Sequence, residues 1–134
     1  HYPLRRQRQM CIRDRSSNEL RVTNNLLYNG GNVGYKPIRA SAFNDASLAE
    51  YKRDIKAWNH DALTDLTERT QLYSFKYKDD EKNKQHYGLV IGDGYKTPES
   101  LIDDDGVNLY DMLAHAYRAI QQLNEKVEAL ENGK

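Results

Sequence analysis

The last quarter of the chain carries a regular spacing of apolar residues, and this feature restricts the fold more than any other. Between residues 109 and 130 the spacing alternates between four and three. This heptad pattern predicts a long helix that ends at Gly133. A helix packed only within its own chain would carry a wider apolar stripe, so the narrow seam also indicates self-association. Its mixed aliphatic residues do not fix the number of chains. The seam comprises Leu109, Leu113, Ala116, Ile120, Leu123, Val127 and Leu130.

Three shorter helical segments are expected ahead of this helix. The first is Leu48–Trp58, in which the apolar residues recur at the spacing of one helical face. Asp61 is a suitable N-terminal cap for a second helix, which would turn Leu63 and Leu66 inward. Pro98–Ile102 predicts a single helical turn. The residues that share the face of the first segment are Tyr51, Ile55 and Trp58.

Two segments with strand patterns complete an α+β fold class. Leu72–Lys78 alternates between aromatic and polar residues, and Tyr87–Ile91 is β-prone, so the two predict a β-hairpin with a charged tip. Further upstream, Ser16–Asn25 predicts a short strand and Val33–Phe43 an extended β segment. Pro37 makes a central strand unsuitable there.

Composition limits the chain to one small domain with a modest core, because 134 residues are only 38% hydrophobic and 30% charged. The single cysteine, Cys11, excludes an internal disulfide. No apolar run reaches the roughly 18 residues of a membrane span, and the first residues lack a secretory signal. The four histidines are scattered without the spacing of zinc ligands, so we expect no metal or cofactor.

The charge is unevenly distributed although the net charge is zero. Residues 1–15 hold five arginines and one aspartate, a balance of +4, which leaves −4 for the remainder. An acidic body argues against a nucleic-acid-binding surface. Met10–Arg15 looks like the translation of a transposase-type sequencing adapter. We therefore predict that residues 1–15 are adapter- or cloning-derived, or else a disordered basic arm.

The sequence around Ser47 supports two interpretations of this residue. With Glu50 it forms the S-x-x-E pattern of a capping box, in which both side chains satisfy amides of a helix's first turn. Lys52, five residues on, could instead serve as the base that activates a serine nucleophile. On a straight helix the two side chains would lie about 140° apart. They could meet only if Ser47 precedes the first turn, where a cap would also lie.

Two glycine-containing loops match ligand-binding motifs only in part. In Gly92–Thr97, Tyr95 occupies the position that a phosphate-binding loop gives to glycine, so we predict a turn. Asp103–Gly106 begins like a calcium loop, but the twelfth position is Ala114 instead of a bidentate glutamate. An acidic turn ahead of a helix is the simpler interpretation.

Taken in order, these segments are similar to a known domain. Residues 35–131 resemble the C-terminal intramolecular chaperone auto-processing domain, peptidase family S74, which ends phage tail spikes, tail fibres and neck appendages. One departure is that Gly92 and Asp93 follow the second strand, where many members carry Ala-Gln-Glu. This puts a role for that glutamate in doubt. The resemblance rests on Tyr35–Asn44, the S-x-x-x-x-K-x-x-I pattern of Ser47–Ile55, Tyr73–Lys78, Tyr87–Ile91 and Val107–Glu131.

The resemblance implies a homotrimer that holds the upstream segments in register while a β-structured fibre stem folds. It implies further that Ser47, with Lys52 as base, then attacks the carbonyl of Ala46 and releases the domain. Residues 16–46 would be the end of the stem and residues 47–134 the removable chaperone. The precursor would be made in the cytoplasm of the bacterial host, and the product would belong to the virion tail or appendage.

Two alternatives remain at this point. The domain could be a non-cleaving trimerisation module of a phage fibre, with Ser47 only a helix cap. It could instead bind nucleic acid through the basic arm and the helix-plus-hairpin pattern, but the acidic body counts against this. We therefore expect the chain's own copies and its fibre stem as partners, and neither nucleic acid nor a membrane.

Overall fold

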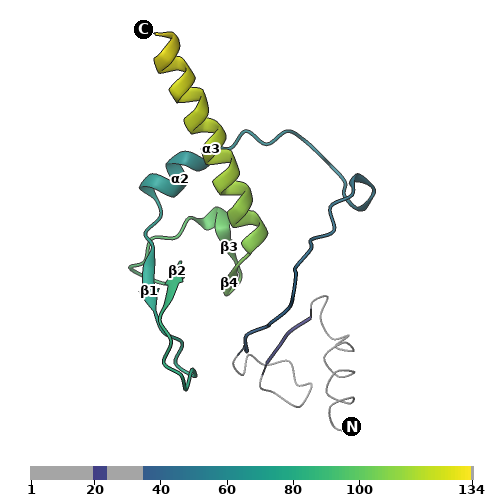
Figure 1. Ribbon diagram of the computed structural model, residues 1–134, viewed down its shortest axis with the longest axis vertical. Helices are drawn as coiled ribbons and strands as arrows, with labels where there is room; N and C mark the ends of the chain where they lie inside the picture. Colours follow the sequence, from purple (N-terminus) through teal and green to yellow (C-terminus); the bar gives the residue numbers. More distant parts are fainter. Residues whose placement is uncertain (1–19, 24–34, 134) are drawn as a thin grey trace. The chain divides into compact units, whose positions relative to one another are not determined.

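The computed structural model describes residues 20–23 and 35–133, in a chain that divides into two compact units, 1–44 and 45–134 (Figure 1). In the first unit, Thr23 and Tyr35 form an isolated antiparallel bridge, and the Lys36 amide donates to the Val22 carbonyl at 2.9 Å. Residues 36–44 follow without a regular strand. The predictions for residues 1–15 lie outside the described residues.

The second unit confirms the α+β class. Two short antiparallel hairpins and several short helical segments precede one long helix (Figure 1). The elements are η1 (Ala49–Tyr51), α2 (Ala62–Glu68), β1 (Tyr73–Phe75), β2 (His86–Gly88), η2 (Glu99–Leu101), β3 (Ile102–Asp103), β4 (Gly106–Val107) and α3 (Leu109–Asn132).

The long helix predicted from the heptad pattern is present as α3. Asn108 caps its start, since the Asn108 side chain accepts a hydrogen bond from the Asp111 amide at 3.1 Å. Gly133 follows its last residue, and the Gly133 amide donates to the Ala129 carbonyl at 3.0 Å. The predicted stop is therefore correct.

Helix α2 lies against α3 (Figure 1), and polar side-chain contacts join the two. Asp61 caps α2 as predicted, because its side chain accepts from the Thr64 amide at 3.1 Å. Gln122 of α3 then joins the two helices: its Oε1 accepts from the Leu63 amide and its Nε2 donates to Asp61 Oδ1, both at 2.8 Å. These directional bonds fix where α2 lies along α3.

Few side chains of the second unit are buried. No large side chain of the described residues is fully buried, and Leu63 and Leu66, predicted to point inward, are only half-buried. A folded domain normally gains most of its stability from buried apolar side chains. The residues that the structure describes therefore form only a small core. The buried residues of the described part are Ala62, Asp65, Pro98, Leu101, His115 and Ala119.

The predicted β-hairpin is present but shorter than expected. β1 and β2 pair antiparallel with Ser74 opposite Tyr87. Tyr77, expected on the half-buried face, lies beyond β1 and is exposed. Asp80 organises the charged tip, since its carboxylate accepts from the amides of Lys82 and Lys84 at 2.9 and 3.0 Å. These bonds lower the pKa of Asp80.

The two glycine-containing loops, Gly92–Thr97 and Asp103–Gly106, both form turns, as predicted. Asp104 and Asp105 connect β3 to β4, whose register places Asp103 opposite Gly106, and Asp104 has a φ of 57°. In the other loop the Tyr95 amide donates to the Gly92 carbonyl at 3.2 Å. Gly94 there has a φ of 87°, a conformation that favours glycine.

The predicted helix Leu48–Trp58 is wrong. Only the three-residue turn η1 forms, and Asp54 interrupts any continuation with a φ of 56°. The residues expected to share a buried face, Tyr51, Ile55 and Trp58, are all exposed. Short helices depend on packing of an apolar face. Trp58 stacks on His60, but the described residues leave Tyr51 and Ile55 largely exposed, so this face is not packed as a unit.

Acid should weaken the junction between α2 and α3 through Asp61. Hydrogen bonds from the Thr64 hydroxyl and the Gln122 amide lower the pKa of Asp61 from 3.8 to about 2. A carboxyl whose pKa is lower in the folded state stabilises the fold above its unfolded pKa, and this contribution disappears as pH falls from about 4 to about 2. Asp61→Asn keeps an acceptor for the Thr64 amide but does not titrate.

We therefore expect the urea midpoint of Asp61→Asn to change less between about pH 4 and pH 2 than that of the wild type. Asp65 and Asp80 titrate in both proteins, so the comparison isolates Asp61. Parallel midpoint curves for the two proteins would contradict this role.

Candidate functional site

Ser47 and Lys52 are in direct contact. The Lys52 Nζ donates a hydrogen bond to the Ser47 Oγ at 2.6 Å. Neither residue belongs to a regular helix, because Ser47 precedes Leu48, the N-terminal cap of η1, and Lys52 directly follows Tyr51. This irregular backbone avoids the separation of about 140° that a straight helix would impose. The geometry therefore brings together the two residues singled out in the sequence.

The capping-box interpretation of Ser47 and Glu50 is wrong. Leu48 occupies the cap position of η1, and no side chain accepts a capping hydrogen bond there. A three-residue 3₁₀ turn leaves few free amides for a capping box to satisfy. The Ser47 Oγ instead accepts a hydrogen bond from the Lys52 Nζ and lies within hydrogen-bonding distance of the Tyr110 hydroxyl.

Tyr110 is a third polar residue at this position, and sequence patterns did not indicate it. Its hydroxyl lies 3.5 Å from the Ser47 Oγ, although the two residues are 63 positions apart. Tyr110 belongs to the first turn of α3. No local spacing relates it to Ser47, so only the fold could reveal this neighbour.

The surroundings of the Ser47–Lys52 pair are open and partly apolar. Residues 45–58 are exposed throughout, and Leu48, Tyr51 and Ile55 lie on both sides of Lys52 in the sequence. An amine can act as a base only when it is neutral, and desolvation is one general way to favour that form. A covering surface over this segment would supply the desolvation.

Six of the seven residues of the predicted α3 seam are exposed in the single chain, and Ala116 is half-buried. Ile120 is 62% exposed and Leu113 is 60% exposed, whereas His115 and Ala119 are buried toward the rest of the unit. With about 100° per residue, the centres of these two faces lie roughly 90° apart around the helix. The seam is therefore separate from the face that holds α3 to its own chain, and it has the exposure that a partner-binding surface requires.

A buried polar cluster was missed in the sequence. His60, Asp65 and His115 present ligand atoms that all lie within 4.8 Å of one another. Asp65 is held as a carboxylate, because hydrogen bonds from His60 and Arg69 lower its pKa although burial by itself raises it. The two histidines are 55 positions apart in the sequence, so no spacing motif could have joined them.

Comparisons with known proteins give no relative: no protein family, curated protein or solved structure matches the chain. In the part of the chain that the structure describes, no helix is both long and apolar enough to cross a membrane. A functional proposal for this chain therefore depends on the geometry of its own side chains.

Proposed function

We propose that the chain is the C-terminal intramolecular chaperone of a phage tail fibre or appendage, which trimerises and then releases itself by cleavage between Ala46 and Ser47. The observation that carries this proposal is the 2.6 Å contact between the Lys52 Nζ and the Ser47 Oγ. A serine needs an adjacent base to become a nucleophile, and a lysine amine can fill that role. The domain resemblance described above supports the same pair.

In the proposed cleavage, Ser47 attacks the peptide bond that joins it to the preceding residue, Ala46. The Ser47 Oγ attacks the carbonyl carbon of Ala46 through a five-membered ring while Lys52 takes the hydroxyl proton. The C–N bond then breaks, the proton passes to the leaving nitrogen, and an ester joins Ala46 to the Ser47 oxygen. Water hydrolyses this ester and leaves a carboxylate on Ala46 and a free amine on Ser47. Because the nucleophile is fixed beside its target, little orientational entropy is lost.

Trimerisation is supported by the small core and the exposed seam. Few of the described residues are buried, and most of the α3 seam and the segment 45–58 are exposed. Three copies packed through α3 would bury the seam and hold three upstream stems in register. Preassembled stems avoid much of the loop-closure cost of an intertwined β-structure. The partners are thus other copies of the chain and its own fibre stem.

The proposed order of events couples folding to release. Assembly covers residues 45–58 with a neighbouring chain, desolvates the serine–lysine pair and thereby permits cleavage. The precursor is made in the host cytoplasm, and residues 16–46 remain with the fibre on the virion. No cofactor, nucleic acid or membrane is required for this sequence of steps.

A second function is favoured by the seam alone. A non-cleaving trimerisation module needs the exposed apolar face of α3 and makes no use of the Ser47–Lys52 contact. In that case Ser47 is an ordinary surface serine. The two functions differ in one observable, which is whether the peptide bond before Ser47 is cut.

Intact mass separates the two functions. We expect the wild-type chain to yield fragments that meet at Ala46 and Ser47, and Ser47→Ala to remain whole. Ser41→Ala, another exposed serine ahead of the cut, is the matched control and should cleave like the wild type. Each sample is also measured by light scattering. An intact wild-type trimer would overturn cleavage and leave the trimerisation module; cleavage of Ser47→Ala at the same bond would overturn the role of Ser47.

A further inference from the structure

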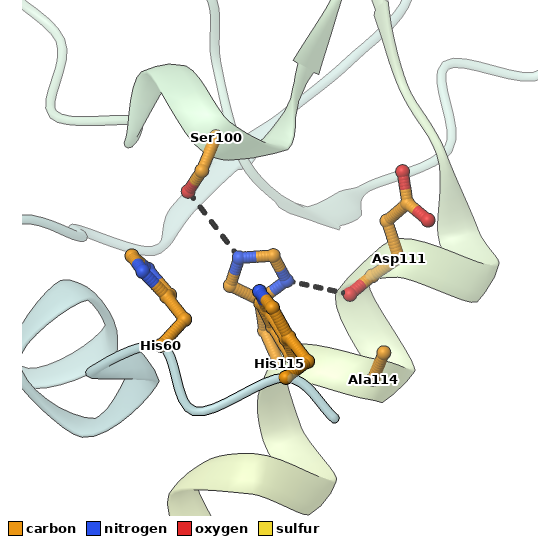
Figure 2. A pocket seen from close by; sticks show the side chains of 6 residues that line it. His60, Ser100, Asp111, Ala114 and His115 are labelled. Atoms are coloured by element: carbon orange, nitrogen blue, oxygen red, sulfur yellow. Dashed lines mark hydrogen bonds between the residues drawn. The ribbon is translucent and has the colours of Figure 1, made fainter. Parts of the chain in front are cut away.

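A cluster of two histidines and one aspartate joins three parts of the second unit. His60 precedes α2, Asp65 lies within α2, and His115 belongs to α3. Figure 2 shows the His115 ring between Ser100 and the backbone carbonyl of Asp111, with His60 beside it. The donor atoms of the two imidazoles and the carboxylate all lie within 4.8 Å of one another. None of these residues takes part in the proposed cleavage.

His115 is oriented as metal-binding histidines are. Its Nδ1 lies 2.8 Å from the Asp111 carbonyl oxygen, which can only accept a hydrogen bond. In the neutral ring Nδ1 therefore carries the hydrogen, and Nε2, which lies 3.3 Å from the Ser100 Oγ, is the nitrogen with the free lone pair. A backbone carbonyl that fixes the tautomer in this way is the usual outer partner of a histidine ligand. The residue is buried, with only 4% of its surface exposed.

Asp65 is oriented equally well by an outer partner. The Arg69 Nη1 donates to its Oδ1 at 2.8 Å, which leaves Oδ2 directed at the His60 Nε2, 2.5 Å away, and at the Ser100 Oγ, 3.4 Å away. A carboxylate accepts hydrogen bonds only, so the His60 Nε2 supplies a proton to this contact. Zinc bonds of about 2.0–2.2 Å at a tetrahedral angle separate two ligand atoms by roughly 3.3 Å, so a bound ion would displace that proton and move the two side chains slightly apart.

We propose that His60, Asp65 and His115 form a zinc-binding site. Two imidazole nitrogens and one carboxylate oxygen are a ligand set that zinc prefers. A cavity of about 360 Å³, lined in part by Ser100 and Ala114, lies beside the two histidines and leaves space for a water molecule as fourth ligand (Figure 2). Magnesium is a poor competitor because it prefers oxygen ligands.

Zinc at this position would act as a structural cross-link. It would join the segment ahead of α2 to α2 and to α3, where Ala62 and Ala119 are the buried apolar residues. Metal-binding free energy adds directly to folding stability when the unfolded chain lacks the site. The site therefore offsets the small core without any change in the exposed seam.

The test is a zinc titration of the chelator-treated full chain, followed by its unfolding temperature and by tryptophan fluorescence. Trp58 is the only tryptophan, and its ring stacks on His60 at 5.4 Å between centroids, so its emission reports on the site. We expect one zinc ion per chain, and a rise in Tm of roughly 10 °C once free zinc reaches about one hundred times Kd. Magnesium at the same concentration should have no effect.

The matched variants are His60→Gln and His86→Gln. Glutamine at position 60 keeps an N–H group for Asp65 but is a weak zinc ligand, so affinity should fall by at least about a hundredfold. His86 lies in β2 and stacks on Phe75, so its replacement should leave zinc binding unchanged. No zinc response in the wild type, or an equal response in His60→Gln, would overturn the proposal.

X-ray absorption of the wild-type zinc complex needs no variant. We expect ligands at about 2.0–2.2 Å with the outer-shell scattering of two imidazoles. A sulfur ligand at about 2.3 Å would place the ion on Cys11 and overturn the proposed site. The site lies between residues 60 and 115, so cleavage at Ala46 does not affect either measurement.

Discussion

Replacing Ile120 by glutamate is expected to convert a trimeric assembly into monomers. Ile120 lies at the middle of the α3 seam and is 62% exposed in the single chain. If the seam is the trimer interface, each chain loses roughly 1.5–3 kcal/mol of apolar burial, before the cost of placing a carboxylate there. Over three chains this weakens association by at least about a thousandfold. Light scattering over a range of concentrations measures the change directly.

The matched control for this variant is Gln121→Glu. Gln121 is the next residue of α3 and is also exposed, but it lies about 130° from the centre of the seam. It adds the same charge at nearly the same height along the helix. We expect Gln121→Glu to associate like the wild type, with equal helix content by circular dichroism in all three proteins. An Ile120→Glu variant that associates as strongly as the wild type would show that the seam is not the interface.

Elements defined by local chemistry were predicted well from the sequence. The heptad spacing and Gly133 gave both the type and the end of α3, and Asp61 gave the start of α2. For both helices, the apolar spacing and the residue that starts or ends the helix lie within a few positions of each other, so a short stretch of sequence is enough to predict them. The β1–β2 hairpin was predicted for the same reason, although its strands are shorter than the alternating pattern.

The segment Leu48–Trp58 was predicted wrongly because the described residues provide ring contacts for Trp58 but leave Tyr51 and Ile55 exposed. The spacing of Tyr51, Ile55 and Trp58 is helical, yet the backbone forms only η1 and then turns at Asp54. Periodicity indicates which side chains should be buried together. It does not reveal whether their partner lies in the same chain.

The residues of the candidate sites also differ in how far they could be predicted from local sequence. Ser47 and Lys52 are close in sequence, so their pairing could be proposed from spacing, whereas the approach of Tyr110 could not. His60 and His115 meet only because α2 packs on α3. Such long-range neighbours follow from tertiary packing and leave no local motif in the sequence.

Replacing Lys52 by arginine is expected to stop cleavage while leaving assembly intact. Arginine retains the positive charge and can still donate a hydrogen bond toward Ser47, but its guanidinium does not release a proton at neutral pH. A positioned general base contributes roughly 100- to 10,000-fold to the rate of such a reaction. The fraction of cut chain, followed over time by intact mass, should therefore fall by at least about a hundredfold.

The matched control is Lys56→Arg, which makes the same substitution four residues further along the same exposed segment. It should cleave at the wild-type rate. Light scattering on Lys52→Arg separates a missing base from a failure to assemble, since only the latter changes the oligomeric state. If Lys52→Arg cleaves as fast as the wild type, then the 2.6 Å contact with Ser47 is only a surface hydrogen bond and another group removes the serine proton. If Lys52→Arg assembles normally but is not cleaved, a positive charge at position 52 is not enough for cleavage. The reaction then requires a side chain there that can accept a proton.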